Sequence, residues 1–215
     1  MPGMLEIATS QGTARAHLHR APEPAAALML GHGAGGGVAA RDLAAVSEAA
    51  RALGVTVALV EQPYLVAGRR SPAPAPRLDQ AWIEVADRLR SGELEGLALI
   101  VGGRSSGARV ACRTAEETGA VAVLCLAFPL VPPRRASDGR SHSRIDELDA
   151  VRVPTLVVQG AGDPFGVPPA GRQREVAVIA GNHSLNSDLR ALRGAVTEWL
   201  ARVLEGSARS SPISR

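Results

Sequence analysis

The 215-residue sequence predicts one α/β domain built on a single open, doubly wound sheet whose strands run mostly parallel. Runs of about five apolar residues recur along the chain, as expected for strands that are buried on both faces of a sheet. Amphipathic segments with apolar residues at helical spacing separate these runs, as expected for helices that cover the two faces. The chain shows no internal repeat and no linker long enough to divide it, so we expect a single domain.

The chain opens with an expected antiparallel hairpin and then alternates strands with helices. Two short extended segments, residues 5–9 and 14–19, flank a turn at residues 10–13. The apolar runs predict buried strands at residues 26–30, 56–60, 97–101, 121–126, 155–159 and 175–179. Helical spacing predicts helices at residues 41–53, 78–90, 106–118 and 189–204.

The remaining segments predict loops and a tail. Residues 68–76 and 129–144 are rich in Pro and Arg, which is typical of irregular surface loops. Since residues 129–144 are the irregular part of the connection between two neighbouring strands, we expect no inserted cap domain. We expect the domain to span residues 1–205 and the polar residues 206–215 to form a flexible tail.

Composition argues against several classes of protein. All 24 basic residues are Arg, and 21 acidic residues reduce the formal charge to +3, so the chain has no polybasic arm. Two Trp, two Phe and one Tyr are too few for a platform that stacks single-stranded nucleic acid. The longest apolar stretch, residues 120–133, contains prolines and falls short of the roughly 20 residues that span a bilayer. Residues 1–10 lack the pattern of a secretory signal.

We therefore expect a cytoplasmic protein that acts on a small molecule, with no nucleic-acid or membrane partner; no feature of the sequence specifies an oligomeric state. The two Cys, at positions 112 and 125, are too few for a disulfide scaffold, and their apolar surroundings predict small buried side chains. No His, Cys and Asp cluster has the spacing of a metal site, so we expect neither a metal nor a cofactor.

A candidate nucleophile follows the predicted strand at residues 97–101. Gly103, Ser105 and Gly107 form a GxSxG pattern between this strand and the next helix. This pattern is typical of a nucleophile elbow, in which a sharp turn holds the Ser in a strained conformation while small neighbours let the backbone approach closely. The position between strand and helix favours this interpretation over a Gly-rich turn without chemistry.

Two further polar residues follow predicted strands and lie at the same edge of the sheet. Asp163 follows the strand at residues 155–159, and His183 follows the strand at residues 175–179. In open α/β sheets the active crevice lies outside the carboxyl ends of the strands. An Asp there can fix the tautomer of a catalytic imidazole, although an Asp before Pro is also common in turns. The chain order Ser105, Asp163, His183 is the order that this architecture uses for a catalytic triad.

A Gly-rich loop supplies the fourth element of the candidate site. Residues 31–37 follow the predicted strand at residues 26–30. A tetrahedral oxyanion needs two preorganised N–H donors, which such folds take from this loop and from the residue after the nucleophile. We assign these donors to the backbone N–H groups of Ala34 and Ser106.

These segments resemble the α/β-hydrolase superfamily, and within it a compact bacterial branch loosely related to dienelactone hydrolases. The resemblance covers roughly residues 25–204, and its motifs are HGAGG at 32–36, GRSSG at 103–107, GAGDPF at 160–165 and NHS at 182–184. It implies a serine hydrolase in which Ser105 is the nucleophile, His183 the general base and Asp163 its partner. The implied substrate is a small carboxylic ester, lactone or thioester, cleaved through an acyl-enzyme.

The sequence departs from the family pattern after Asp163. Three prolines lie between this residue and the next predicted strand, so the helix usual in that interval is expected to be very short or absent. Without this helix and without a cap domain, the pocket is expected to be shallow and open.

The Arg residues bear on whether the substrate carries a negative charge. A guanidinium near the site would recognise a carboxylate or phosphate, but a chain without Lys places Arg on every solvated loop. We name Arg104, inside the elbow, and His32, in the Gly-rich loop, as candidate substrate-binding residues. The loop arginines that could border the site are Arg69, Arg70, Arg134 and Arg135.

Two other functions remain open. Gly31, Gly33 and Gly36 also form a GxGxxG pattern, and Glu61 follows the next strand, where a dinucleotide-binding fold places its ribose-binding acid. Against this alternative, the helical pattern begins only near Ala40, whereas the dinucleotide-binding helix opens at the third glycine. The other alternative is a catalytically silent hydrolase-fold module that binds a partner protein.

Overall fold

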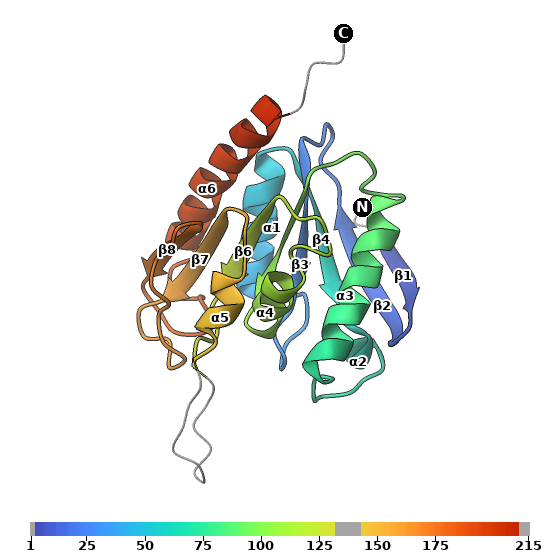
Figure 1. Cartoon of the computed structure of the whole chain (residues 1–215), viewed down its shortest axis with the longest axis horizontal. Helices are drawn as coiled ribbons and strands as arrows, with labels where there is room; N and C mark the ends of the chain where they lie inside the picture. The colour runs from blue at the N-terminus through green and yellow to red at the C-terminus, as the bar shows by residue number, and fades with distance from the viewer. Residues whose placement is uncertain (1–2, 132–142, 211–215) are drawn as a thin grey trace.

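A computed structural model describes residues 3–131 and 143–210 of the chain. Their central feature is an eight-stranded sheet in the order β1-β2-β4-β3-β5-β6-β7-β8 (Figure 1). The antiparallel hairpin of β1 and β2 pairs antiparallel with β4, and the remaining neighbours pair parallel. This arrangement confirms the predicted mostly parallel sheet with an antiparallel start. The strands are β1 (Gly3–Thr9), β2 (Gly12–His19), β3 (Ala26–Gly31), β4 (Val55–Glu61), β5 (Leu99–Arg104), β6 (Ala122–Leu126), β7 (Thr155–Gly160) and β8 (Arg174–Ile179).

Helices cover both faces of the sheet, with α1 and α6 on one face and α3, α4 and α5 on the other (Figure 1). Each face holds its own apolar cluster. In β3, Met29 packs into the cluster beneath α3 and α4, whereas Leu28 and Leu30 pack beneath α1 and α6. The strand is wholly apolar because both of its faces are buried. The helices are α1 (Arg41–Ala52), α2 (Pro63–Val66), α3 (Ala75–Arg90), α4 (Ser106–Arg113), α5 (Ile145–Asp149) and α6 (Leu189–Ser210).

Within the described ranges, no helix has both the length and the apolar character needed to cross a membrane. Cys112 and Cys125 are buried and unbridged, and their Sγ atoms lie 3.4 Å apart between α4 and β6.

Several helix boundaries differ from the sequence-based expectation. Helix α4 ends at Arg113, five residues before the predicted end at 118. The hydroxyls of Thr114 and Thr118 donate to the carbonyls of Val110 and Thr114, each at 2.8 Å, and such local bonds compete with regular helix. Helix α3 begins at Ala75, three residues early, because Pro at position 76 fits the first turn of a helix.

The loop and tail predictions also need correction. Helix α2 and helix α5 lie where the sequence predicted no helix. Helix α6 continues to Ser210, so residues 206–210 of the expected flexible tail are helical. The central part of the expected 129–144 loop, residues 132–142, lies outside the described residues.

The connections at the site edge are short. Between β6 and β7 the described residues contain one five-residue helix, α5, and form no cap domain. The interval from Asp163 to β8 holds no helix, as the prolines predicted. Strand β3 lies between β4 and β5, so the winding of the chain reverses there and leaves a crevice at the carboxyl ends of the strands.

The start of α4 contacts the end of β3 through backbone atoms. A Cβ on Gly107 would lie 2.6 Å from the carbonyl carbon and oxygen of Gly31, and a Cβ on Gly103 would lie 2.6 Å from the same oxygen. Only glycines at 103 and 107 permit this approach, which fixes the nucleophile elbow against the Gly-rich loop.

We predict opposite effects on stability for the same Gly→Ala change at two helical sites. Gly107→Ala forces a methyl group against backbone and should lower the free energy of unfolding by about 1–3 kcal/mol or more. Gly194→Ala, in α6, meets nothing within 4 Å and should raise it by about 1 kcal/mol, since Ala favours helix over Gly. Urea unfolding of the two variants measures both values, and a fully stable Gly107→Ala protein would contradict the described contact.

Candidate active site

Ser105 lies in the turn that joins β5 to α4, with φ 53° and ψ −110°. Its N–H donates to the carbonyl of Leu126 at the end of β6, at 2.8 Å. A positive φ is strained for a residue with a side chain, and such strain is maintained only where the surroundings fix the backbone. The close contact at Gly103 and Gly107 provides that constraint, so the Ser105 hydroxyl projects from a rigid elbow.

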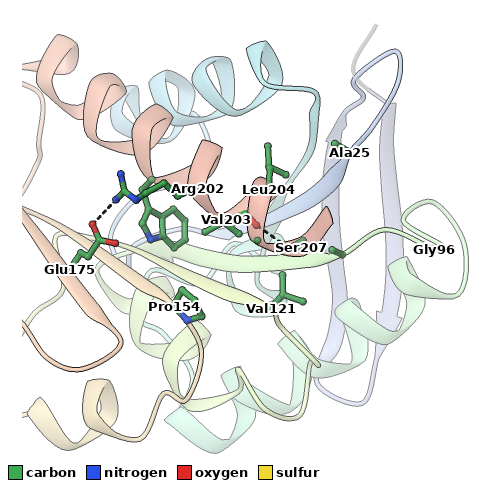
Figure 2. Close-up of a pocket in the computed structure, with 12 residues that line it drawn as sticks. Ala25, Gly96, Val121, Pro154, Glu175, Arg202, Val203, Leu204 and Ser207 are labelled. Atoms are coloured by element: carbon green, nitrogen blue, oxygen red, sulfur yellow. Dashed lines mark hydrogen bonds and ion pairs between the residues drawn. The ribbon is translucent and has the colours of Figure 1, made fainter. Parts of the chain in front are cut away.

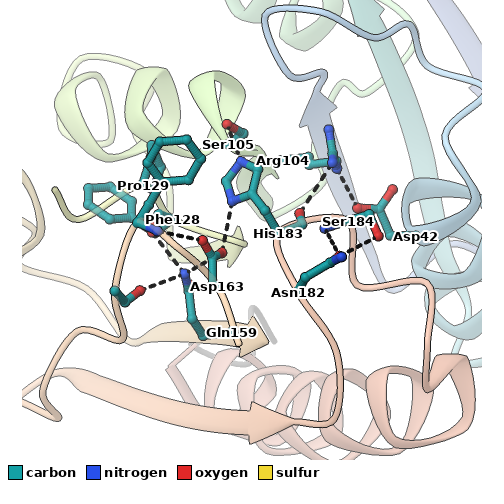
Figure 3. Close-up of polar contacts among 12 residues, drawn as sticks. Asp42, Arg104, Ser105, Phe128, Pro129, Gln159, Asp163, Asn182, His183 and Ser184 are labelled. Atoms are coloured by element: carbon teal, nitrogen blue, oxygen red, sulfur yellow. Dashed lines mark hydrogen bonds and ion pairs between the residues drawn. The ribbon is translucent and has the colours of Figure 1, made fainter. Parts of the chain in front are cut away.

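The three residues predicted as a triad lie in contact at the carboxyl edge of the sheet (Figure 3). His183 Nε2 lies 2.9 Å from Ser105 Oγ, and His183 Nδ1 lies 2.8 Å from Asp163 Oδ2. The residues follow β5, β7 and β8, and the Asp163 side chain is fully buried while that of His183 is 21% exposed. Phe165 packs edge-on against the imidazole, with ring centroids 4.6 Å apart.

The hydrogen-bond partners of Asp163 define the tautomer of His183. An ionised carboxylate only accepts hydrogen bonds, so the nitrogen that faces it, Nδ1, carries the proton. Nε2 then presents its lone pair to the Ser105 hydroxyl, which donates. This arrangement can transfer a proton from Ser105 to His183 without any side-chain movement.

Gln159 is a site residue that the sequence analysis missed. Its buried Nε2 donates to Asp163 Oδ2 at 2.8 Å, and also contacts the carbonyls of Phe128 at 3.1 Å and Gly166 at 2.9 Å. The N–H of Phe165 donates to Asp163 Oδ1 at 2.9 Å. These contacts hold the carboxylate although no helix follows it. The available signal was an amide residue at the end of an otherwise apolar strand.

His32, predicted to bind substrate, is buried beneath the Gly-rich loop. Its Nδ1 donates to the Gly33 carbonyl at 2.8 Å, and its Nε2 accepts from the N–H of Gln62 at 3.1 Å. Tyr64 packs against this ring and donates from its hydroxyl to the Ala34 carbonyl at 3.2 Å. Burial lowers the pKa of His32 below its ordinary value. The neutral imidazole therefore holds the loop in shape.

The two residues predicted to supply oxyanion donors, Ser106 and Ala34, lie at the start of α4 and in the Gly-rich loop. Ser106 is the first residue of α4, where N–H groups have no partner within the helix and the helix dipole favours negative charge. Ala34 lies in the turn that His32 and Tyr64 support, closed by a bond from Gly36 N–H to the Gly33 carbonyl at 3.3 Å.

The candidate anion-binding arginines lie in different environments. Arg104 points to Asp42 and to the carbonyl of His183, with its side chain 19% exposed (Figure 3). Arg69 and Arg70 are exposed after α2. Arg134 and Arg135 lie outside the described residues.

A cavity of about 750 Å³ opens at the opposite edge of the sheet (Figure 2). Its lining includes residues just before β3, β5, β6 and β7, residues at the end of α6, and Trp199. Its charged pair, Glu175 and Arg202, is exposed and in contact at 2.6 Å. Ser207, which lines this cavity, donates its hydroxyl to the carbonyl of Val203 at 3.0 Å rather than to a base. Across the described residues, no group of three or more His, Cys, Asp or Glu side chains is arranged to hold a metal ion.

A family profile for the alpha/beta hydrolase domain matches residues 24–199. The chain belongs to the α/β-hydrolase superfamily. The match covers the sheet from β3 onward together with all of the site residues discussed above. A search of curated protein sequences finds no match.

Solved structures of other proteins share the fold. Est1E from Butyrivibrio proteoclasticus is 18% identical with a TM-score of 0.74, covering 94% of this chain and 99% of its own. XC6422 from Xanthomonas campestris, described as a serine hydrolase without lid, is 19% identical with a TM-score of 0.74 and covers 94% of each chain. A dienelactone hydrolase from Anabaena variabilis is 16% identical with a TM-score of 0.74, covering 94% of this chain and 97% of its own. At such low identity the likeness concerns the fold alone.

Two observations argue against a dinucleotide-binding site. Helix α1 begins at Arg41, five residues after the third glycine of the GxGxxG pattern. Glu61, the candidate ribose-binding acid, contacts the imidazole of His17 at 3.1 Å.

We predict that His32 stays neutral and that acid destabilises the fold through it. Because its pKa is lowered in the folded state, the unfolded chain binds a proton more readily, so stability is lost as pH falls below about 6.5 toward the lowered pKa. Imidazole ¹⁵N NMR should show the Nδ1–H tautomer and a titration midpoint below that of free His.

Urea unfolding between pH 8 and pH 5 measures how the free energy of unfolding changes with pH. His32→Gln keeps one donor and one acceptor but cannot titrate, so its stability should fall less steeply with acid than that of the wild type. A steeper fall, or a His32 that is protonated at pH 6.5, would contradict the neutral role.

Proposed function

We propose that this α/β hydrolase is a serine hydrolase that cleaves small ester-type substrates (carboxylic esters, lactones or thioesters) through an acyl-enzyme on Ser105. The observation that carries the proposal is the continuous set of contacts from Ser105 Oγ through His183 to Asp163, at 2.9 and 2.8 Å. Nucleophile, base and orienting group within hydrogen-bond reach are the geometric signature of an activated nucleophile.

In the acylation step, Ser105 Oγ attacks the substrate carbonyl carbon while His183 Nε2 takes the hydroxyl proton. The carbonyl becomes a tetrahedral oxyanion, and His183 becomes an imidazolium that the Asp163 carboxylate stabilises through Nδ1–H. As the intermediate collapses, His183 gives its proton to the leaving alcohol or thiol. A general base of this kind contributes typically about 10²–10⁴-fold.

The N–H groups of Ser106 and Ala34 supply the oxyanion hole. Both donors are backbone groups, one at the start of α4 and the other in a loop supported by His32 and Tyr64, so little reorganisation accompanies charge development. Loss of one such donor typically lowers kcat by about 10²–10³-fold.

Deacylation repeats the chemistry with water as the nucleophile. His183 Nε2 takes a proton from water as its oxygen attacks the acyl carbon, and returns it to Ser105 Oγ when the ester bond breaks. The products are the free carboxylic acid and the regenerated hydroxyl. The side chain of His183 is 21% exposed, so water can reach the base.

We predict that Ser105→Ala removes both reaction with a fluorophosphonate probe and hydrolysis of p-nitrophenyl esters. Loss of the nucleophile should lower kcat by about 10⁴–10⁶-fold, since only binding and the oxyanion hole remain. Intact-mass spectrometry measures the probe adduct, and peptide mapping should place it on Ser105.

The control is stability, because the substitution removes one partly buried hydroxyl and should leave the urea midpoint close to wild type. A wild-type protein that the probe does not modify would favour the catalytically silent, partner-binding module instead. Retention of near-native ester turnover by Ser105→Ala would refute the proposed mechanism.

A further inference from the structure

The side chain of Arg104 leaves the elbow directly before Ser105 and enters a space between three segments of the site (Figure 3). Its Nε lies 2.7 Å from Asp42 Oδ2 as an ion pair, and its Nη2 donates to the carbonyl oxygen of His183 at 3.2 Å. Its Nη1 lies so close to the Gly-rich loop that a Cβ on Gly33 would be 2.9 Å from it. The guanidinium therefore contacts the first turn of α1 and the loop that carries His183, and it lies against the Gly-rich loop at Gly33.

The ion pair is almost entirely enclosed on the Asp42 side. The Asp42 side chain is 1% exposed, and its Oδ1 accepts from the N–H of Leu43 at 2.9 Å. Burial raises the pKa of Asp42, and the positive charge of Arg104 opposes that rise. A buried carboxylate with one cationic partner fixes that partner in place, because separation would leave an uncompensated charge.

The carbonyl that Arg104 holds belongs to the residue that carries the imidazole. The loop that carries His183 is also anchored by the N–H of Gly162, which donates to the carbonyl of Gly181 at 2.8 Å, and by the buried Leu185. Within the loop, Asn182 Oδ1 accepts from Ser184 N at 3.0 Å and from Ser184 Oγ at 2.8 Å. A guanidinium has donors in a fixed planar fork, so it can hold two acceptors at a defined angle. The hydrogen bond from Arg104 therefore links the backbone of His183 to the residue that directly precedes Ser105.

The geometry points to Arg104 as a positioning residue, fixed by Asp42, that sets the distance between the His183 imidazole and the Ser105 hydroxyl. The effect of Arg104 on catalysis rests on the proposed function. The geometry also assigns Arg104 a role other than the anionic-substrate recognition expected from sequence, since its Nε and Nη2 atoms already contact acceptors of the protein. A displacement of the base by about 1 Å can reduce a rate by about 10²-fold.

The experiment compares variants that separate positioning from stability. Arg104→Met leaves Asp42 buried and unpaired, so the double variant Arg104→Met with Asp42→Asn removes the charge as well. The matched control is Arg113→Met, which breaks another partly buried ion pair: Arg113 contacts both oxygens of Asp79 at 2.6 and 2.8 Å, and its side chain is 20% exposed. Arg113 lies at the other end of α4, away from Ser105.

The first readout is steady-state kinetics with a neutral p-nitrophenyl ester and with one that carries a free carboxylate. The double variant should lose about 10- to 100-fold in kcat on both esters with little change in KM. Arg113→Met should keep kcat within about twofold even if its urea midpoint falls, since its ion pairs with Asp79 and Glu147 hold α4 to α3 and α5. A wild-type kcat in the double variant, or a rise in KM confined to the anionic ester, would overturn the positioning role.

The second readout does not depend on activity. Amide hydrogen exchange, measured by mass spectrometry on the full chain, should speed up in residues 180–187 of the double variant and remain at the wild-type rate in Arg113→Met. Unchanged exchange in that segment would overturn the inference. If the wild-type protein hydrolyses no ester, the proposed function fails, while the exchange result still decides whether Arg104 holds the histidine loop.

Discussion

The close backbone contact between the end of β3 and the start of α4 is the constraint on which the rest of the site depends. It needs hydrogen atoms in place of side chains at Gly103 and Gly107, both of which face Gly31. This contact forces the chain through the strained turn at Ser105 and brings the start of α4 beside the Gly-rich loop. Ser105 and the backbone N–H of Ser106 are thereby placed by backbone packing, before any side chain of the site is considered.

Buried polar side chains then fix the remaining groups, because each of them must find partners out of water. Gln159 contacts the Asp163 carboxylate and two carbonyls, and His32 bridges the Gly-rich loop to the segment after β4. Arg104 bridges α1 and the histidine loop. Such a shell keeps the reacting atoms close to productive geometry even where the connecting loops contain no helix.

The sequence predicted the architecture well because strands buried on two faces have a recognisable apolar pattern. It predicted Ser105, Asp163 and His183 together because each directly follows such a strand, and carboxyl ends of parallel strands share one edge. Gln159 and the Arg104–Asp42 pair were missed because their roles depend on partners brought together by the fold; Asp42 is 62 positions from Arg104 in the chain. The end of α4 differed because local hydroxyl bonds, rather than periodicity, set it.

The proposed function requires that backbone and side-chain groups from distant segments converge on one reacting carbonyl. A crystal structure of the protein after reaction with a fluorophosphonate tests it most directly, since the bound phosphonyl group imitates the tetrahedral intermediate. We expect phosphorus bonded to Ser105 Oγ, His183 Nε2 beside the adduct, and the phosphonyl oxygen about 2.7–3.1 Å from the N–H groups of both Ala34 and Ser106. A phosphonyl oxygen directed away from both N–H groups, or an adduct on another residue, would contradict the account.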